Sequence, residues 1–387
     1  MNDQSDYAEM KDLGIAAQAL SLEPKWLQEF DVVDPFNDAA LRGFLSTRPD
    51  HRYGALAVTH VNGEPAPQLV FATPKLHYPF DRQGRFNFPP VREVEIFEKY
   101  DGTNVLAYTY HDARGRRHLT YKLRLSPVLR NGRFGAFLDM WGEMLLRYPV
   151  IPELVGINGC SLGFELYGRR NTHLILYEEP LDCVLLFGVG EGGKPLSPSV
   201  LDSRGVPVAT LYGTLAAGKD PVAEYAEVRQ KLEGGNRPVE DGKIAGVEGA
   251  VWYVRTEGDD TVLFKCKPES VEDVHWVAGI NKASVTATCW NLFETQDVLT
   301  YETLYPLLSE EYADDEIEGF RTCIDECIAE VCQEMEFKSR VMAEYRQVGI
   351  KLSENKAEVM RRLSGKFRKQ EMKRVFTLIS LDEARRT

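Results

Sequence analysis

The chain has 387 residues, of which 43% are hydrophobic, and this length predicts two or three domains with substantial cores. It contains no run of about 18 apolar residues, and its start is polar and acidic, unlike a signal peptide. We therefore expect a cytoplasmic protein without a membrane segment. The net charge of −13 argues against binding nucleic acid with the whole surface, but it permits a local basic groove. Seven scattered cysteines without a Cys-x-x-Cys pair argue against a disulfide framework or a zinc site.

Residues 1–90 are mixed in character and are interpreted as an N-terminal α+β module. The pattern predicts a short helix over residues 20–30 and a strand over residues 54–61. Residues 73–79 contain two prolines, each lacking a backbone donor, so this stretch is predicted to be irregular.

Residues 91–268 are rich in alternating polar and apolar positions and in turn signals, which predicts a sheet domain. A helix is expected over residues 134–146. The predicted strands cover residues 93–96, 104–110, 118–125, 162–167, 174–177, 184–189, 249–254 and 261–267.

Residues 269–387 change to a helical pattern. Apolar side chains between Ile317 and Met335 recur every three or four residues, which predicts one long amphipathic helix. A second helix is predicted after Ser353. The predicted fold class is therefore α+β, with a mixed N-terminal module, a central antiparallel-sheet domain and a helical C-terminal domain.

Lys99 lies in the run Glu98-Lys99-Tyr100-Asp101-Gly102-Thr103-Asn104, at the predicted end of a strand. An amine attacks phosphorus only when it is unprotonated, so a nucleophilic lysine needs neighbouring cations or restricted solvation. Gly102 permits a tight bend, and Asp101 can fix the loop or contact a nucleotide. Taken alone, the run also fits an ordinary exposed turn between two strands.

Four more segments follow in order. Glu165 is a carboxylate within an apolar strand and suits a hydrogen bond to ribose hydroxyls, although a solvent-facing position would look the same. Phe187 can stack on a flat base or belong to the core. Glu248 beside a glycine can bind a divalent cation near phosphate or occupy a turn. Lys265 and Lys267 share one strand face, which suits a triphosphate between them or plain solvation.

The ordered set Lys99-Tyr100-Asp101-Gly102, Phe164-Glu165-Leu166-Tyr167-Gly168, Leu186-Phe187-Gly188, Glu248-Gly249-Ala250-Val251 and Lys265-Cys266-Lys267 resembles the covalent nucleotidyltransferase superfamily of ATP-dependent ligases and mRNA capping enzymes. Within it the chain most resembles the archaeal-type homodimeric, circularising RNA ligases. The long N-terminal module before Lys99 and the helical tail favour this group, since DNA ligases and capping enzymes are expected to carry a strand-rich barrel there.

The resemblance implies that residues 91–268 are the nucleotidyltransferase (adenylation) domain and that residues 269–387 serve dimerisation, RNA binding or both. It implies that Lys99 becomes lysyl-AMP, that Glu165 holds the ribose and that Phe187 stacks on adenine. Glu248 would contribute to a site for Mg²⁺ or Mn²⁺, and Lys265 and Lys267 would hold the α-phosphate. Contacts to the nucleotide or the RNA end are further implied for Glu98, Asp101, Gly102, Asn104 and Arg124.

The implied reaction has three steps: Lys99 takes AMP from ATP, AMP passes to a 5′-phosphate of RNA, and a 3′-hydroxyl displaces AMP. The implied partners are single-stranded RNA with these ends and a second copy of the chain. The alternatives are a DNA ligase, a GTP-using capping enzyme, a non-catalytic relative that binds RNA ends, and a helical dimerisation protein that matches by coincidence.

A basic segment between Lys356 and Arg374 reverses the overall charge, with eight cations against Glu358 and Glu371. It fits a surface that follows RNA phosphates. It equally fits a helix face that pairs with the acidic residues between Asp314 and Glu336. The cations are Lys356, Arg361, Arg362, Lys366, Arg368, Lys369, Lys373 and Arg374.

Overall fold

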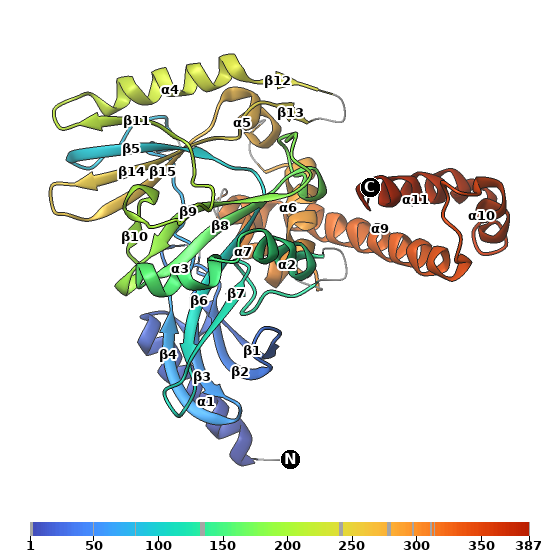
Figure 1. The fold of residues 1–387 in the computed structure, drawn as a ribbon, viewed down its shortest axis with the longest axis horizontal. Helices are drawn as coiled ribbons and strands as arrows, with labels where there is room; N and C mark the ends of the chain where they lie inside the picture. Colours follow the sequence, from blue (N-terminus) through green and yellow to red (C-terminus); the bar gives the residue numbers. More distant parts are fainter. Residues whose placement is uncertain are drawn as a thin grey trace. The chain divides into compact units, whose positions relative to one another are not determined.

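The computed structural model describes residues 3–48, 50–81, 83–131, 136–239, 243–276, 280–295, 298–309, 312 and 314–386. The chain divides into two compact units (Figure 1). The first comprises residues 1–279, 293–297 and 309–311, and the second comprises residues 280–292, 298–308 and 312–387. Antiparallel sheets in the first unit and helices in the second confirm the predicted α+β class. The predicted domain boundaries at residues 90 and 268 stay predictions.

The N-terminal sheet has the strand order β1-β2-β3-β4, and all its neighbours are antiparallel. Its strands are β1 (Leu27–Asp34), β2 (Ala39–Ser46), β3 (Leu56–Val61) and β4 (Glu64–Val70), and helix α1 (Asp3–Leu20) packs on it. The predicted helix over residues 20–30 is wrong. Ser21, with a φ of 53°, ends α1, and after one turn at η1 (Pro24–Trp26) the chain pairs with β2 along the whole of β1.

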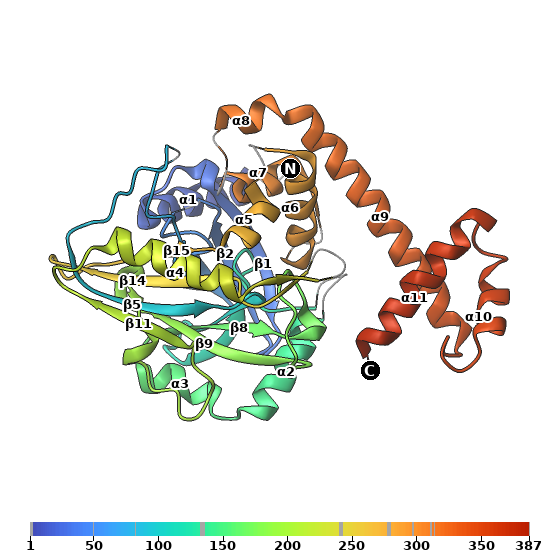
Figure 2. The same cartoon turned by 90° about the horizontal axis from the view of Figure 1, so that it is seen from above.

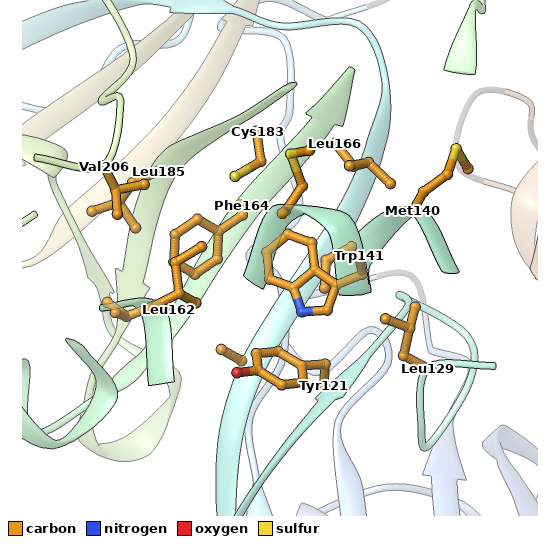
Figure 3. Close-up of a cluster of buried hydrophobic side chains, with 14 of the residues drawn as sticks. Tyr121, Leu129, Met140, Trp141, Leu162, Phe164, Leu166, Cys183, Leu185 and Val206 are labelled. Atoms are coloured by element: carbon orange, nitrogen blue, oxygen red, sulfur yellow. The ribbon is translucent and has the colours of Figure 1, made fainter. Parts of the chain in front are cut away.

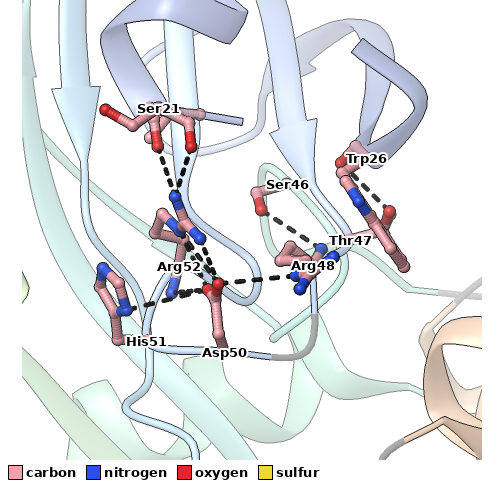
Figure 4. A network of polar contacts seen from close by, with 9 residues as sticks. Ser21, Trp26, Ser46, Thr47, Arg48, Asp50, His51 and Arg52 are labelled. Atoms are coloured by element: carbon pink, nitrogen blue, oxygen red, sulfur yellow. Dashed lines mark hydrogen bonds and ion pairs between the residues drawn. The ribbon is translucent and has the colours of Figure 1, made fainter. Parts of the chain in front are cut away.

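Arg52 fixes the end of α1 against the loop between β2 and β3 (Figure 4). Its Nη1 donates to the carbonyls of Leu20 at 3.1 Å and Ser21 at 2.6 Å, and its Nε donates to both carboxylate oxygens of Asp50 at 3.1 Å. The last carbonyls of a helix lack intrahelical donors, so the guanidinium supplies them.

The second sheet has the order β10-β9-β8-β6-β7. Helices α2 (Phe137–Arg147) and α3 (Ile151–Asn158) cover one of its faces, and Trp141 of α2 packs between Tyr121 and Phe164 in the buried cluster of Figure 3. The strands are β6 (Thr103–His111), β7 (Arg117–Lys122), β8 (Ser161–Tyr167), β9 (Asp182–Val189) and β10 (Pro195–Leu196).

The third sheet has the order β11-β5-β14-β15, and helix α4 (Pro221–Gly235) covers it through a cluster that includes Tyr225 and Trp252. The second and third sheets lie face to face, with α4 outside one and α2 and α3 outside the other (Figures 1 and 2). The strands are β5 (Val91–Lys99), β11 (Leu211–Ala216), β14 (Gly249–Thr256) and β15 (Thr261–Cys266).

The strand predicted over residues 174–177 is wrong: this segment makes only an isolated bridge between Ile175 and Ile244. Its backbone amides instead bind a side chain of the candidate site, as described below. The remaining short elements are β12 (Arg237–Pro238), β13 (Ile244–Ala245), α5 (Glu269–Trp276), η2 (Arg169–Asn171), η3 (Glu191–Gly193) and η4 (Pro198–Val200).

The second unit is helical, as predicted, but the long helix is interrupted at Phe320, where the backbone leaves helical geometry. Apolar side chains of its last three helices share a core, which includes Val341, Val359 and Ile379. The helices of this region are α6 (Lys282–Thr295), α7 (Tyr301–Leu308), α8 (Asp314–Gly319), α9 (Arg321–Val348), α10 (Lys356–Leu363) and α11 (Met372–Arg386), with η6 (Lys369–Glu371) before the last.

Asp34 joins the N-terminal sheet to the second sheet. It is fully buried, and its carboxylate accepts hydrogen bonds from Tyr110 Oη at 2.8 Å and Thr120 Oγ1 at 2.6 Å. Asn37 Nδ2 adds a bond of 2.7 Å to the carbonyl of Leu119. A buried carboxylate is tolerated only with such donors, so the two sheets are fastened at a defined place.

Candidate active site

Lys99 stands at the end of β5, where the chain leaves the third sheet and enters the second at β6. The turn between them is tight, because a Cβ at Gly102 would lie 2.3 Å from the carbonyl oxygen of Leu166. This close approach of two backbones explains the glycine.

Asp101 fixes the turn that follows Lys99. Its Oδ2 accepts hydrogen bonds of 2.6 Å from the backbone amides of Leu174 and Ile175, and its own amide donates to Tyr177 Oη at 2.7 Å. Burial, together with the negative charge of Glu248, raises the pKa of Asp101. The three hydrogen bonds of Asp101 fix the loop that follows Lys99.

Lys99, Glu248 and Lys267 form one ionic cluster. Lys99 Nζ lies 2.5 Å from Glu248 Oε2, and Lys267 Nζ lies 3.0 Å from Glu248 Oε1. Pairing of β14 with β5 aligns Gly249 with Lys99, and pairing of β14 with β15 aligns Ala250 with Cys266, so the three side chains meet. Burial alone would raise the pKa of Glu248, but the two ammonium groups and their hydrogen bonds lower it to about 2.

Glu165 and Asn104 face each other across the paired strands β8 and β6. Glu165 is 8% exposed, and Asn104 Nδ2 lies 3.4 Å from its Oε2. Burial raises the pKa of Glu165 to about 7, against the opposing effect of Lys99. Glu248 raises it further, while His173 and the Asn104 amide lower it. A poorly solvated carboxylate beside Lys99 suits a hydrogen bond to a ligand hydroxyl.

Phe187 lies against a glycine of the neighbouring strand. Gly163 pairs with Phe187, and a Cβ at Gly163 would fall 2.2 Å from the Phe187 ring. Because alternate residues of a strand share a face, Gly163 and Glu165 point to the same side of β8. Phe187 is therefore beside the Glu165 side of the sheet, and 6% of it is exposed.

Three further predicted site residues, Lys265, Arg124 and Glu98, have described contacts with residues outside the ionic cluster. Lys265 Nζ sits 4.4 Å from the ring centre of Tyr78. The guanidinium of Arg124 lies 5.7 Å from the ring centre of Tyr53. Burial raises the pKa of Glu98, and its hydrogen bonds to Thr210 and Tyr212 oppose this rise.

Sequence reasoning missed several side chains that contact the predicted site residues. Thr73 Oγ1 donates to Asn104 Oδ1 at 2.6 Å, Tyr78 underlies Lys265, and Tyr177 holds the amide of Asp101. Thr73 and Tyr78 belong to the stretch predicted as irregular. Its two prolines signalled an absence of regular structure and gave no information on what the stretch contacts.

The described residues contain no group of three or more His, Cys, Asp or Glu side chains that could hold a metal ion alone. Mg²⁺ in nucleotide sites is commonly bound by one or two carboxylates together with phosphate oxygens and water. Glu248 fits such a role with a triphosphate, because it is the carboxylate nearest Lys99. The ammonium groups on both its oxygens would have to move for a metal to bind there.

The cluster combines the amino group of Lys99, a second ammonium group and a buried carboxylate, and Phe187 lies on the Glu165 side of the neighbouring sheet. An amine can attack phosphorus, and an adjacent cation can stabilise the charge that develops on phosphoryl oxygens. The arrangement therefore suits transfer of a nucleotidyl group to Lys99.

No protein-family model matches the sequence, and no curated protein matches it. The chain is similar in structure to an archaeal ATP-dependent RNA ligase (form 2), with 14% identity and a TM-score of 0.45 over 86% of this chain and 79% of that chain. It is also similar to a chain named as an ATP-dependent DNA ligase from Aquifex aeolicus, with 11% identity and a TM-score of 0.41 over 87% and 80% of the two chains.

A variant of Naegleria gruberi RNA ligase with ATP and Mn is similar at 17% identity and a TM-score of 0.33, covering 48% of this chain and 52% of that chain. All three are ligases by name, the class that the sequence motifs resemble. With TM-scores below 0.5, these likenesses carry no weight for function, which we infer from the residues of this chain. No described helix is long and apolar enough to cross a membrane.

Proposed function

We propose that the chain is an ATP-dependent RNA ligase that joins a 5′-phosphate to a 3′-hydroxyl through lysyl-AMP on Lys99. The observation that carries the proposal is the ionic cluster of Lys99, Glu248 and Lys267 beside the buried Glu165. Three segments from distant parts of the sequence supply what the reaction needs: the nucleophilic amine, the positive charge near the phosphates, and a carboxylate that accepts a hydrogen bond from the ribose.

In the first step Lys99 gives up protons to water, its nitrogen attacks the α-phosphorus of ATP, the bond to the β-phosphate oxygen breaks, and pyrophosphate leaves. A 5′-phosphate oxygen of the nucleic acid then attacks the same phosphorus and breaks the phosphorus–nitrogen bond. Finally a 3′-hydroxyl oxygen attacks the 5′-phosphorus, and AMP leaves. Lys267 stabilises the charge on the phosphoryl oxygens, and Glu248 contributes to binding Mg²⁺ or Mn²⁺.

The helical region after Lys267 supports an RNA acceptor. Every regular element described after that residue is a helix, whereas a DNA ligase or capping enzyme is expected to continue with a strand-rich barrel. We also infer a homodimer from the resemblance of the motifs, and light scattering of the purified protein measures the oligomeric state.

The test uses ATP labelled at the α-phosphate together with Mg²⁺ or Mn²⁺. Wild type should acquire covalent label and Lys99→Ala should not. Lys194→Ala removes an exposed lysine that pairs with Asp260 and should label like wild type. Absence of label on wild type would reject the enzyme, and label on Lys99→Ala would reject Lys99 as the nucleophile.

The acceptor is tested with 5′-phosphorylated RNA and DNA of one sequence. Sealing of RNA in preference to DNA supports the proposal. Preference for DNA, or label that forms with GTP in place of ATP, would identify one of the other nucleotidyltransferases.

A further inference from the structure

A threonine of the N-terminal region reaches the candidate site through Asn104. Thr73 is 5% exposed, and its hydroxyl donates to Asn104 Oδ1 at 2.6 Å. Asn104 Nδ2 lies 3.1 Å from the carbonyl oxygen of Phe164 and 3.4 Å from Glu165 Oε2. Three residues from different elements are thus connected in the order Thr73, Asn104, Glu165.

The hydrogen-bonding capacities determine which way the Asn104 amide points. A backbone carbonyl oxygen only accepts, so the side that faces Phe164 must be the NH₂ group. The amide oxygen then faces Thr73, which must donate to it. The same orientation directs an N–H toward Glu165, where it favours the charged form of a carboxylate that burial disfavours.

The segment that carries Thr73 is also fixed to strand β15 a few residues further along the chain. Lys265 N donates to the carbonyl of His77 at 2.8 Å, and His77 forms a parallel bridge with Phe264. The ring of Tyr78 then underlies Lys265 at 4.4 Å. An irregular segment fixed to β15 in this way can hold a hydroxyl in a defined position, which a free loop cannot.

We propose that Thr73 is a positioning residue for nucleotide binding, which holds the Asn104 amide so that Glu165 accepts a hydrogen bond from a ribose hydroxyl. This inference rests on the proposed function, because it needs a nucleotide at Glu165. It extends the site into the N-terminal region, which the nucleotidyltransferase motifs do not cover.

The experiment measures kcat and KM for lysyl-AMP formation with ATP, 2′-deoxyATP and 3′-deoxyATP. Thr73→Val keeps the shape and removes the hydroxyl. It should raise KM for ATP and reduce the preference for ATP over one deoxy analogue by about three- to tenfold, the effect of losing one hydrogen bond. Thr73→Ser should retain the wild-type preference.

Thr120→Val is the matched control. Thr120 is also buried and also donates to a side-chain oxygen at 2.6 Å, but its acceptor is Asp34. The Thr120→Val variant should lose about as much stability as Thr73→Val, but it should keep the wild-type preference for ATP. An unchanged preference in Thr73→Val, or an equal loss in Thr120→Val, would overturn the inference.

A double-mutant cycle keeps the inference testable if Thr73→Val is unstable. Thr73→Ser and Thr73→Ala are compared in the wild-type and Asn104→Ala backgrounds. If Thr73 acts through Asn104, the difference between Ser and Ala disappears once the amide is gone. A difference that persists contradicts the relay. Absence of lysyl-AMP in wild type, by contrast, rejects the proposed function itself.

Discussion

Lys99 and Glu248 are 149 residues apart in the sequence, yet they form an ion pair at the adjacent ends of β5 and β14. The same carboxylate binds Lys267 with its other oxygen. The single negative charge of Glu248 therefore offsets the repulsion between two ammonium groups in a poorly solvated place.

Glu248→Gln should destabilise the protein and suppress lysyl-AMP formation. Removing one member of a buried ion pair leaves the others uncompensated, so the free energy of unfolding should fall by about 3 kcal/mol. Labelling by ATP should fall by about 100-fold, the usual effect of removing one electrostatic contact in a reaction of this kind. Urea unfolding and the label assay measure the two effects. Glu257→Gln, an exposed glutamate in the β14–β15 turn, is the control.

The stability difference between wild type and Glu248→Gln should depend on acid pH. The pKa of Glu248 is lowered to about 2 in the folded protein, below the ordinary value of 4.5. The contribution is therefore complete above pH 4.5 and disappears as the pH falls toward 2. If the difference in the free energy of unfolding between wild type and Glu248→Gln stayed constant from pH 6 to pH 2, this assignment would be contradicted.

Gly163→Ala should displace Phe187 and weaken nucleotide binding. The new methyl group would lie 2.2 Å from the ring, so either the ring or β8 must move, at a cost of about 1–3 kcal/mol. Thermal unfolding and titration with ATP measure the loss of stability and of affinity. Gly213→Ala changes a glycine of β11 that has nothing within 4 Å of its Cβ position, and it should change neither quantity. Equal behaviour of the two variants would refute a role for the Phe187 ring position.

Lys122→Met should change how stability depends on alkaline pH. Lys122 is fully buried and its Nζ donates only to carbonyls in its described contacts, at 2.8 Å to Leu123 and 3.0 Å to Arg124. Burial, with the nearby charge of Arg124, lowers its pKa from 10.5 to about 7. Between pH 7 and pH 10.5 the unfolded chain binds the proton and the folded protein does not, so stability from this group rises with pH.

The measurement for Lys122 is the free energy of unfolding from pH 7 to pH 10 in wild type and Lys122→Met. The wild-type curve should rise relative to that of the variant across this interval. Lys194→Met, which changes an exposed lysine, should run parallel to wild type. A parallel curve for Lys122→Met would show that the buried lysine keeps its proton.

The basic segment of the second unit contains two kinds of cation. Arg361 and Arg362 share Glu358, Lys366 pairs with Glu344, and Arg374 pairs with Glu334. Within the described residues, no ion pair includes Arg368, Lys369 or Lys373. Pairing with an acidic helix has support, because α9 supplies Glu334 and Glu344. A surface that follows RNA phosphates also has support, because part of the basic segment is not neutralised.

Lys369→Gln/Lys373→Gln should weaken binding of single-stranded RNA more than Arg361→Gln/Arg362→Gln. Lys369 and Lys373 carry two uncompensated charges. Arg361 and Arg362 carry one between them, because Glu358 offsets the other. Each phosphate contact on a single strand contributes about 0.7 to the slope of log K against log salt, so the first variant should lose about 1.4. Titrations at several salt concentrations give the slopes, and lysyl-AMP formation should be unchanged. Identical slopes in both variants would show that Lys369 and Lys373 contribute no more to RNA binding than Arg361 and Arg362 do.

The sequence identified the strands that carry the chemistry because their charged residues interrupt otherwise regular apolar alternation. Lys99, Glu248 and Lys267 lie at or next to the ends of such strands, and Glu165 lies within β8. Their convergence follows from the pairing of β5 with β14, of β14 with β15 and of β6 with β8. The order of motifs could not show that Lys265 would contact Tyr78, because that depends on a segment without periodicity.

Strand β3 of the N-terminal sheet was expected over residues 54–61, but β2 and β4 could not be predicted, for two physical reasons. Residues Ala39–Ser46 are almost entirely buried, so β2 lacks the alternation that marks a half-exposed strand. Two prolines, Pro65 and Pro67, argue against a strand over Glu64–Val70. However, β4 is at the edge of its sheet, where a missing donor is tolerated.

The hydrogen bonds of Asp34 bear on how far the protein can be shortened. A fragment that begins at β5 would leave Tyr110 and Thr120 without their acceptor in the interior of the second sheet. It would also lack Thr73 and Tyr78, which contact the candidate site. The minimal adenylating fragment should therefore include the first ninety residues, and limited proteolysis should not release them as a separable piece.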